Sequence, residues 1–325
     1  MAADIVQPCS RLVAFCAAAL CVATAGAAYP ERPVRLVVPY SAGGSTDTVA
    51  RLVATRLSER LGQQVVVDNR TGAGTLIGTE IVARSIPDGY TLLMATPPLA
   101  VNPSLYPKVP YVLARDFTAV GNIAASSNLL VVHPSVPAKT TRELIELFKA
   151  NPGKYNYGSS GVGGAGHLAM ALFESMAGVT AVHVPYKGGA PAVADLVGGR
   201  LSLMMANLTT AQPHIRSGRL RALGIGTKTR SRLFPELPTI AESGVPGYEA
   251  NNWNGVVAPA KTPKAVIERL NREIVAVLKE PQVSERMAKS ALEPIGDTPA
   301  EFARYLRAEA DKWGKLVRTA GIKAE

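Results

Sequence analysis

The sequence predicts an α/β protein built from two lobes. Short apolar runs alternate with amphipathic helices from Tyr29 to about Thr227. This alternation, with short connections, is typical of a mostly parallel sheet that is covered by helices on both faces. The pattern restarts near residue 127, and each of the two sets carries one glycine-rich loop after a strand. Two such sets in one chain indicate two lobes.

The first set follows from strand and helix periodicity. The run 35–39 contains consecutive β-branched residues and is followed by a glycine-rich turn. This pattern is typical of a strand. Beyond it, Val49, Leu52, Val53 and Leu57 share one helical face, and Gly62 occupies the position that favours a left-handed helix end. The expected elements are strand 35–39, helix 47–61, strand 64–68, helix 77–85 and strand 91–94.

The second set repeats this order. Thr140 and Glu143 have the spacing of a capping box, in which each residue satisfies a free backbone N–H of the helix start. The expected elements are strand 129–132, helix 140–150, strand 155–157, helix 166–177, strand 181–184, helix 190–196, strand 201–205 and strand 222–225.

In the last quarter of the chain, long helices replace the alternation of strands and helices. One more strand, 254–258, precedes helices that begin at Thr262-Pro263 and Thr298-Pro299. Both pairs combine an N-cap residue with proline at the first helical position. The final helix carries a broad apolar face, which we expect to pack on the first lobe. The predicted division is therefore 28–126 plus 252–325 for lobe 1 and 127–251 for lobe 2.

The N-terminus predicts secretion. Arg11 precedes the apolar run 12–22, and Ala25-Gly26-Ala27 fits a cleavage site. The run is shorter than the roughly 20 residues that a membrane span needs. We therefore expect residues 1–27 to be a signal peptide and the mature protein to be periplasmic. All three cysteines lie in this segment, so the mature chain has no disulfide, thiolate nucleophile or cysteine metal site.

The charge favours small anions over nucleic acid. Lysine and arginine exceed aspartate and glutamate by 35 to 25, a net charge of +10. Such a field attracts anions. A nucleic-acid surface would gather this charge on one stripe with aromatic residues between, whereas the basic residues here are scattered over predicted helices. We expect a monomer that binds no nucleic acid.

Two glycine-rich loops are the main candidates for a ligand site. The first is 41–47 and contains Gly43, Gly44 and Ser45; the second is 159–167 and contains Ser159 and Ser160. Each follows a strand and opens a helix, where free N–H groups and the helix dipole favour an anion. Ligands of open α/β sheets bind beyond the carboxyl ends of strands. The alternative is that the glycines only form turns and the hydroxyls only cap helices.

Enzyme and cofactor signatures are missing. Gly161, Gly163 and Gly166 match G-x-G-x-x-G, but the next strand ends without the carboxylate that a dinucleotide site requires. Neither loop contains G-x-S-x-G. The four histidines are isolated in sequence and form no zinc motif. Among them, His167 is a candidate ligand contact because it follows the second loop. We expect neither catalysis, nor a metal, nor a cofactor.

Several blocks of the chain have a specific pattern. They are Val38-Pro39-Tyr40-Ser41-Ala42-Gly43-Gly44-Ser45-Thr46-Asp47, Leu61-Gly62-Gln63, Asn69-Arg70-Thr71-Gly72-Ala73-Gly74, Pro87-Asp88-Gly89-Tyr90-Thr91, Asn102-Pro103-Ser104-Leu105-Tyr106, His183-Val184-Pro185-Tyr186-Lys187-Gly188 and Trp253-Asn254-Gly255. In order and spacing they resemble Bug-type receptors, the TctC-like extracytoplasmic binding proteins of tripartite tricarboxylate transporters.

The resemblance implies a type II periplasmic-binding fold, with two lobes that are joined by two crossing strands and close on a carboxylate. It also implies membrane transport subunits as partners. Two departures concern the ligand: Ala206 stands where the family often has aspartate, and Pro97-Pro98 replaces polar residues after Thr96. Without an acidic side chain at 206 to pair with an amine, we expect a mono- or dicarboxylate and not an amino acid.

The sequence therefore predicts a receptor that captures a small organic anion for transport. A receptor that reports its ligand to a signalling protein is the alternative, and a periplasmic hydrolase is a third reading. The predicted ligand-binding residues are Gly43, Gly44, Ser45, Thr46, Asp47, Thr96, Ser159, Ser160, Gly161, His167, Ala206 and Asn207.

Overall fold

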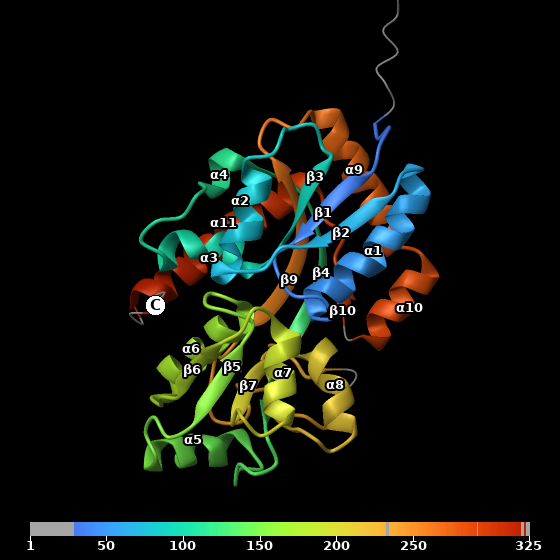
Figure 1. Ribbon diagram of the computed structural model, residues 1–325. Helices are drawn as coiled ribbons and strands as arrows, with labels where there is room; N and C mark the ends of the chain where they lie inside the picture. Colours follow the sequence, from blue (N-terminus) through green and yellow to red (C-terminus); the bar gives the residue numbers. More distant parts are fainter. Residues whose placement is uncertain (1–28, 232–233, 291, 320–321, 323–325) are drawn as a thin grey trace, which may run out of the picture.

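A computed structural model describes residues 29–231, 234–290, 292–319 and 322 (Figure 1). The predicted signal peptide lies outside these residues. Ten strands of the described chain form one continuous mixed sheet in the order β2-β1-β3-β9-β4-β7-β5-β6, and β8 and β10 also pair with β4. Helices flank this sheet in two lobes, one above the other in the view of Figure 1. None of the described helices combines the length and the apolar character that a membrane span requires.

The upper lobe contains the first predicted set. Strand β1 pairs in parallel with β2 and β3, and β3 pairs antiparallel with β9. The elements are β1 (Val34–Val38), α1 (Ser45–Leu61), β2 (Val65–Asn69), a 3₁₀ turn η1 (Ala73–Thr75), α2 (Leu76–Ala83), β3 (Thr91–Ala95), α3 (Pro97–Leu105) and α4 (Leu113–Asp116). The predicted helix end at Gly62 is confirmed: this glycine has φ of 70°.

Two strands cross between the lobes. Strand β4 (Phe117–Val132) is 16 residues long, and β9 (Asn251–Pro259) runs antiparallel beside its first part, from the pair Phe117–Pro259 to the pair Ser127–Asn251. The second part of β4 pairs with β7 and β8 of the other lobe. This arrangement confirms the predicted fold class. The residue boundaries of the two lobes stay a prediction.

The lower lobe contains the second predicted set. Strand β5 pairs in parallel with β6 and β7. The elements are α5 (Thr141–Ala150), β5 (Asn156–Ser159), α6 (Ala165–Ala177), β6 (Val182–Pro185), α7 (Gly189–Val197), β7 (Leu203–Asn207), α8 (Leu208–Arg216) and β8 (Arg221–Ile225). At α5 the predicted N-cap is present, because the Thr140 side chain accepts a hydrogen bond from the Glu143 N–H at 3.1 Å.

The remaining elements are α9 (Lys264–Leu278), α10 (Pro281–Lys289), β10 (Leu292–Pro294) and α11 (Pro299–Thr319). Helix α11 spans more than the sequence suggested. Phe302 and Leu306 in its first half pack on β3 and β9, as expected for a return to the first lobe. Trp313 and Val317 in its second half join a hydrophobic cluster made mainly by the lower lobe. The second half of the final helix therefore belongs to a core that α3 shares with the lower lobe.

Helix α3 was not predicted, because it contains three prolines. Pro97 and Pro98 occupy its first two positions, where the backbone N–H groups have no partner within the helix and proline is tolerated. Pro103 lies inside the helix, which ends two residues later at Leu105. The side chains of Leu99 and Val101 are buried. Tertiary packing thus stabilises a helix that local sequence preference alone disfavours.

Candidate functional site

A small cavity of about 40 Å³ lies between the lobes. It is formed at the carboxyl ends of strands and the starts of helices, where ligands of open α/β sheets bind. Upper and lower lobes both contribute to its wall. The lining residues are Tyr40, Gly44, Ser45, Thr46, Asn128, Ser160, Ala165, Gly166, Gly189, Met204, Met205, Asn207, Thr210 and Asn252. None of these side chains carries a formal charge at neutral pH.

Four helix N-termini surround this cavity. Helices α1, α6 and α7 are capped by Gly44, Gly164 and Gly188, and at none of the three does a side chain accept a hydrogen bond from the helix start. The fourth, α8, begins after Asn207, whose side chain accepts from the Thr209 N–H at 3.0 Å. Unsatisfied N–H groups and the positive ends of helix dipoles together favour an anion. Glycine caps leave these donors open to a ligand.

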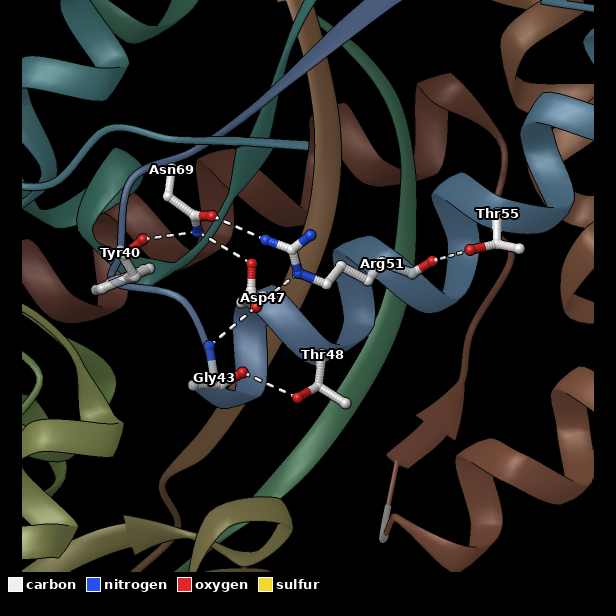
Figure 2. A network of polar contacts seen from close by, with 8 residues as sticks. Tyr40, Gly43, Asp47, Thr48, Arg51, Thr55 and Asn69 are labelled. Atoms are coloured by element: carbon white, nitrogen blue, oxygen red, sulfur yellow. Dashed lines mark hydrogen bonds and ion pairs between the residues drawn. The ribbon is translucent and has the colours of Figure 1, made fainter. Parts of the chain in front are cut away.

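An internal network fixes the first loop (Figure 2). The buried carboxylate of Asp47 accepts hydrogen bonds from the Gly43 N–H at 2.9 Å, from Arg51 Nε at 2.9 Å and from Asn69 Nδ2 at 3.0 Å. Asn69 Nδ2 also donates to the Tyr40 carbonyl at 2.9 Å. Burial raises the pKa of Asp47, but the hydrogen bonds from Arg51, Gly43 and Asn69 outweigh this effect and lower it. Asp47 is therefore ionised, and its charge is balanced by Arg51 one helical turn later.

The second loop is fixed from behind by two histidines. Ser159 Oγ lies 2.6 Å from His183 Nε2 and 3.1 Å from both the N–H and the carbonyl oxygen of Gly161. His167 Nδ1 accepts a hydrogen bond from the Gly163 N–H at 3.0 Å. Ser159 is fully buried, and His167 is 6% exposed. These contacts hold the loop against β6, so that Ser160 and not Ser159 faces the cavity.

Several polar groups on the cavity wall have no hydrogen-bond partner among the residues that the structure describes. Within the described part of the chain, the hydroxyls of Ser45, Thr46 and Ser160 and the side-chain amide of Asn252 form no hydrogen bond. Gly164 has no side chain, and a Cβ atom there would lie 2.7 Å from Ser160 Oγ. The glycine thus leaves room for the serine hydroxyl. The wall offers neutral donors from both lobes to a ligand.

The family model TctC, described as tripartite tricarboxylate transporter family receptor, matches residues 49–322. The chain belongs to this family. Three solved structures are similar over about nine tenths of it. A Rhodopseudomonas palustris protein, Rpa4515 with adipate, is 41% identical, with a TM-score of 0.88 over 91% of this chain and 99% of that one. The periplasmic binding protein BugD is 36% identical, with a TM-score of 0.87 over 91% and 100%. MatC of R. palustris with bound malate is 30% identical, with a TM-score of 0.85 over 89% and 100%.

Membership of this receptor family confirms the resemblance that the sequence blocks indicated. The fold class is confirmed as well, since the alignments with the BugD and Rpa4515 structures each cover 91% of this chain. TctC-type proteins are solute-binding receptors. That the individual site residues contact a ligand stays a prediction. The structure gives the position of each of them.

Five of the twelve predicted site residues of the receptor line the cavity: Gly44, Ser45, Thr46, Ser160 and Asn207. The others do not line it. Gly43, Asp47, Ser159, Gly161 and His167 belong to the hydrogen-bonded supports of the two loops.

Thr96 and Ala206 do not line the cavity. Thr96 precedes α3, and its Oγ1 is 3.2 Å from the hydroxyl of Tyr40, which does line the cavity. Ala206 has no exposed surface and belongs to a hydrophobic cluster with Leu129 and Val193. Its neighbours Met205 and Asn207 line the cavity, whereas Ala206 packs in the core.

A third glycine loop at the cavity was not predicted from the sequence. Lys187-Gly188-Gly189 follows β6 and opens α7, the same order of strand, glycines and helix that identified the other two loops. Asn128 on β4 and Asn252 on β9 also line the cavity and were not predicted either. These two residues lie on the crossing strands, where no loop signal marks them.

The third loop of the receptor also joins the lobes directly. The Ser41 N–H donates to the Lys187 carbonyl at 3.1 Å. A Cβ atom on Gly188, which has φ of 155°, would overlap Ser41 Oγ. A Cβ on Gly44 would lie 4.0 Å from the Gly189 nitrogen. Glycines at these positions allow the two lobes to approach each other beside the cavity.

Proposed function

We propose that this protein is a periplasmic receptor that captures a small dicarboxylate between its lobes and delivers it to the membrane subunits of a tripartite transporter. One observation carries the proposal: glycine-capped helix starts from both lobes converge on one cavity. Each helix start favours negative charge. Starts from both lobes suit a ligand with more than one anionic group.

The composition of the wall favours a dicarboxylate over an amino acid. An α-ammonium group that leaves water needs a carboxylate or several acceptors as partners. The lining residues include no aspartate or glutamate, and the nearby Asp47 is already bound by Arg51, Asn69 and Gly43. The relatives described with adipate and with malate support the same ligand class. The lining residues also include Met204, Met205 and Ala165, so the wall is not polar throughout.

The proposed location rests on the N-terminal pattern around residues 11–27 and on the family. Sequencing of the N-terminus of protein from the periplasmic fraction tests it. The expected start is near Ala28 or Tyr29. The processed protein should not react with a thiol reagent, because all three cysteines precede that point. Retention of the cysteines in the periplasmic fraction would contradict the proposed processing.

Isothermal titration with adipate, malate, a monocarboxylate of matched length and glutamate tests the ligand class. We expect the dicarboxylates to bind most tightly. Native mass spectrometry of protein purified without refolding shows in parallel which ligand it retains. Binding of glutamate, an amino acid that has two carboxylates, without binding of adipate or malate would refute the proposal.

A pair of variants at Gly189 isolates the role of ligand charge. A Cβ atom at this position of α7 has no neighbour within 4 Å, so a side chain fits without strain. Gly189→Asp and Gly189→Asn add side chains of nearly equal size that differ by one charge. Aspartate is favourable at a helix start, so the fold tolerates it. We expect Gly189→Asp to bind a dicarboxylate much more weakly than Gly189→Asn does. Equal affinities of the two variants would show that the ligand carries no charge near this helix.

A further inference from the structure

Three aromatic rings are stacked behind the second glycine loop. The rings of His167 on α6 and His183 on β6 lie nearly parallel, with centroids 4.1 Å apart and an angle of 6° between the planes. Tyr157 on β5 stacks on His183 at 4.8 Å and 20°. The arrangement connects two strands of the lower lobe with the first turn of the helix whose N-terminus lines the cavity.

Each histidine holds one end of the loop 159–167. His183 Nε2 lies 2.6 Å from Ser159 Oγ, at the end of β5. His167 Nδ1 accepts from the Gly163 N–H at 3.0 Å, and this contact fixes its protonation: Nδ1 must carry no proton. The loop between these anchors includes Ser160 and leads to Gly166, both of which line the cavity.

The anchored loop has little freedom to settle elsewhere. Gly163 has φ of 73°, and a Cβ atom there would lie 2.8 Å from Leu105 and 2.9 Å from Asn102 of α3. A Cβ atom on Gly166 would lie 2.6 Å from the Met205 carbonyl oxygen. The loop therefore fits tightly between α3 of the upper lobe and β7 of the lower lobe. A small displacement at Gly163 would move the Ser160 hydroxyl and the open N–H groups of α6.

We propose that His167 is a positioning residue for ligand binding: its unprotonated Nδ1 holds Gly163, and the stacked ring of His183 fixes the orientation of the imidazole. The proposal rests on the proposed function, since the positioned groups are those that would contact the dicarboxylate. His167 does not line the cavity and acts only through the loop.

The electrostatic environment keeps the pair uncharged. Burial lowers the pKa of His167 to about 4. Burial and the neighbouring His167 lower the pKa of His183 to about 3. The other titratable groups around the stack are Tyr157, whose pKa is raised by burial and by Glu174, and Glu174, whose pKa is raised by burial to about 7. At neutral pH both imidazoles are therefore neutral, as the acceptor role of Nδ1 requires.

Two substitutions of His167 separate the acceptor from the ring. His167→Asn places an amide oxygen near the position of Nδ1 and keeps the acceptor for Gly163. His167→Phe keeps a stacked ring and removes the acceptor. We expect His167→Asn to bind adipate within about twofold of the natural protein. We expect His167→Phe to bind about three- to tenfold more weakly, the change that corresponds to one neutral hydrogen bond. His133→Asn is the matched control, because His133 bonds Ser135 at the far end of β4.

Measurements without ligand test the role of His167 independently of whether the protein binds a dicarboxylate. Hydrogen exchange of the Gly163 amide should be slow in the natural protein and in His167→Asn, and fast in His167→Phe. Nitrogen-15 chemical shifts should show His167 with an unprotonated Nδ1. Unchanged adipate affinity and unchanged Gly163 protection in His167→Phe would overturn the positioning role. Failure of the natural protein to bind any dicarboxylate, with Gly163 protection still dependent on the acceptor, would instead overturn only the proposed ligand class.

Discussion

Removal of two cavity hydroxyls, one from each lobe, should weaken dicarboxylate binding without weakening the fold. Ser45 opens α1 and Ser160 lies in the second glycine loop. Neither hydroxyl has a partner within the described chain, so its removal leaves no buried group unsatisfied. Substitution with alanine should therefore leave the free energy of unfolding of the ligand-free protein nearly unchanged. Any loss appears in the affinity alone.

The expected magnitude follows from hydrogen bonds to a charged partner. Such a bond contributes roughly 1.5–3 kcal/mol, so each single variant should lose about tenfold or more in affinity. If Ser45 and Ser160 bind carboxylates at opposite ends of the ligand, their losses are independent and add in free energy. The double variant should then lose about a hundredfold or more.

Titration calorimetry with adipate measures these losses, and thermal unfolding without ligand measures stability. Ser217→Ala, at the end of α8, is the matched control for a serine away from the cavity. Ser159→Ala is the informative contrast, because Ser159 Oγ bonds His183 and Gly161 and its loss should lower stability as well as affinity. Wild-type affinity in the double variant would refute the two-lobe site.

Two further predictions concern closure and pH. Gly188→Ala should prevent full closure, because its Cβ would overlap Ser41 Oγ; small-angle scattering at saturating adipate should then show no decrease in radius of gyration, unlike the natural protein. The ligand-free protein should lose stability as the pH falls from about 6.5 towards 4, because the unfolded chain then binds protons on His167 and His183 that the folded chain excludes. Glu174, with its raised pKa, acts in the opposite direction between about 4.5 and 7 but contributes only one proton. Thermal unfolding at several pH values checks this, and the slope should be smaller in His167→Asn.

The periodicity of apolar residues in the sequence was sufficient to predict most of the strands and helices. The strands and helices around both glycine loops were predicted within one or two residues, because buried strands read as continuous apolar runs and amphipathic helices repeat every 3.6 residues. Strand β4 was predicted only over 129–132, whereas it extends from Phe117. Its first part contains Gly121 and Asn122, which weaken a strand pattern; pairing with β9 supplies the stability that the local sequence lacks.

The site was only partly predictable, because chain order does not show which hydroxyl of a loop faces the ligand. Ser159 and Ser160 are adjacent and chemically identical, yet one bonds His183 and the other lines the cavity. The choice depends on β6, which is distant in sequence. Asp47 illustrates the same limit. It is an acidic residue in the first turn of a helix, as the sequence indicated, but its partners Arg51 and Asn69 are visible only in the fold.

The absence of charged side chains from the cavity wall has a consequence for how the receptor responds to its surroundings. Backbone N–H groups, serine hydroxyls and asparagine amides do not titrate between pH 4 and 8. Tyr40, the one lining group that titrates at all, has its pKa raised by burial to about 12. Over this range the wall therefore presents a constant field of dipoles. Changes in affinity with pH must come from the carboxylates of the proposed ligand or from groups behind the wall, such as His167, His183 and Glu174. The ratio of affinities of the natural protein and His167→Asn isolates the part that His167 contributes.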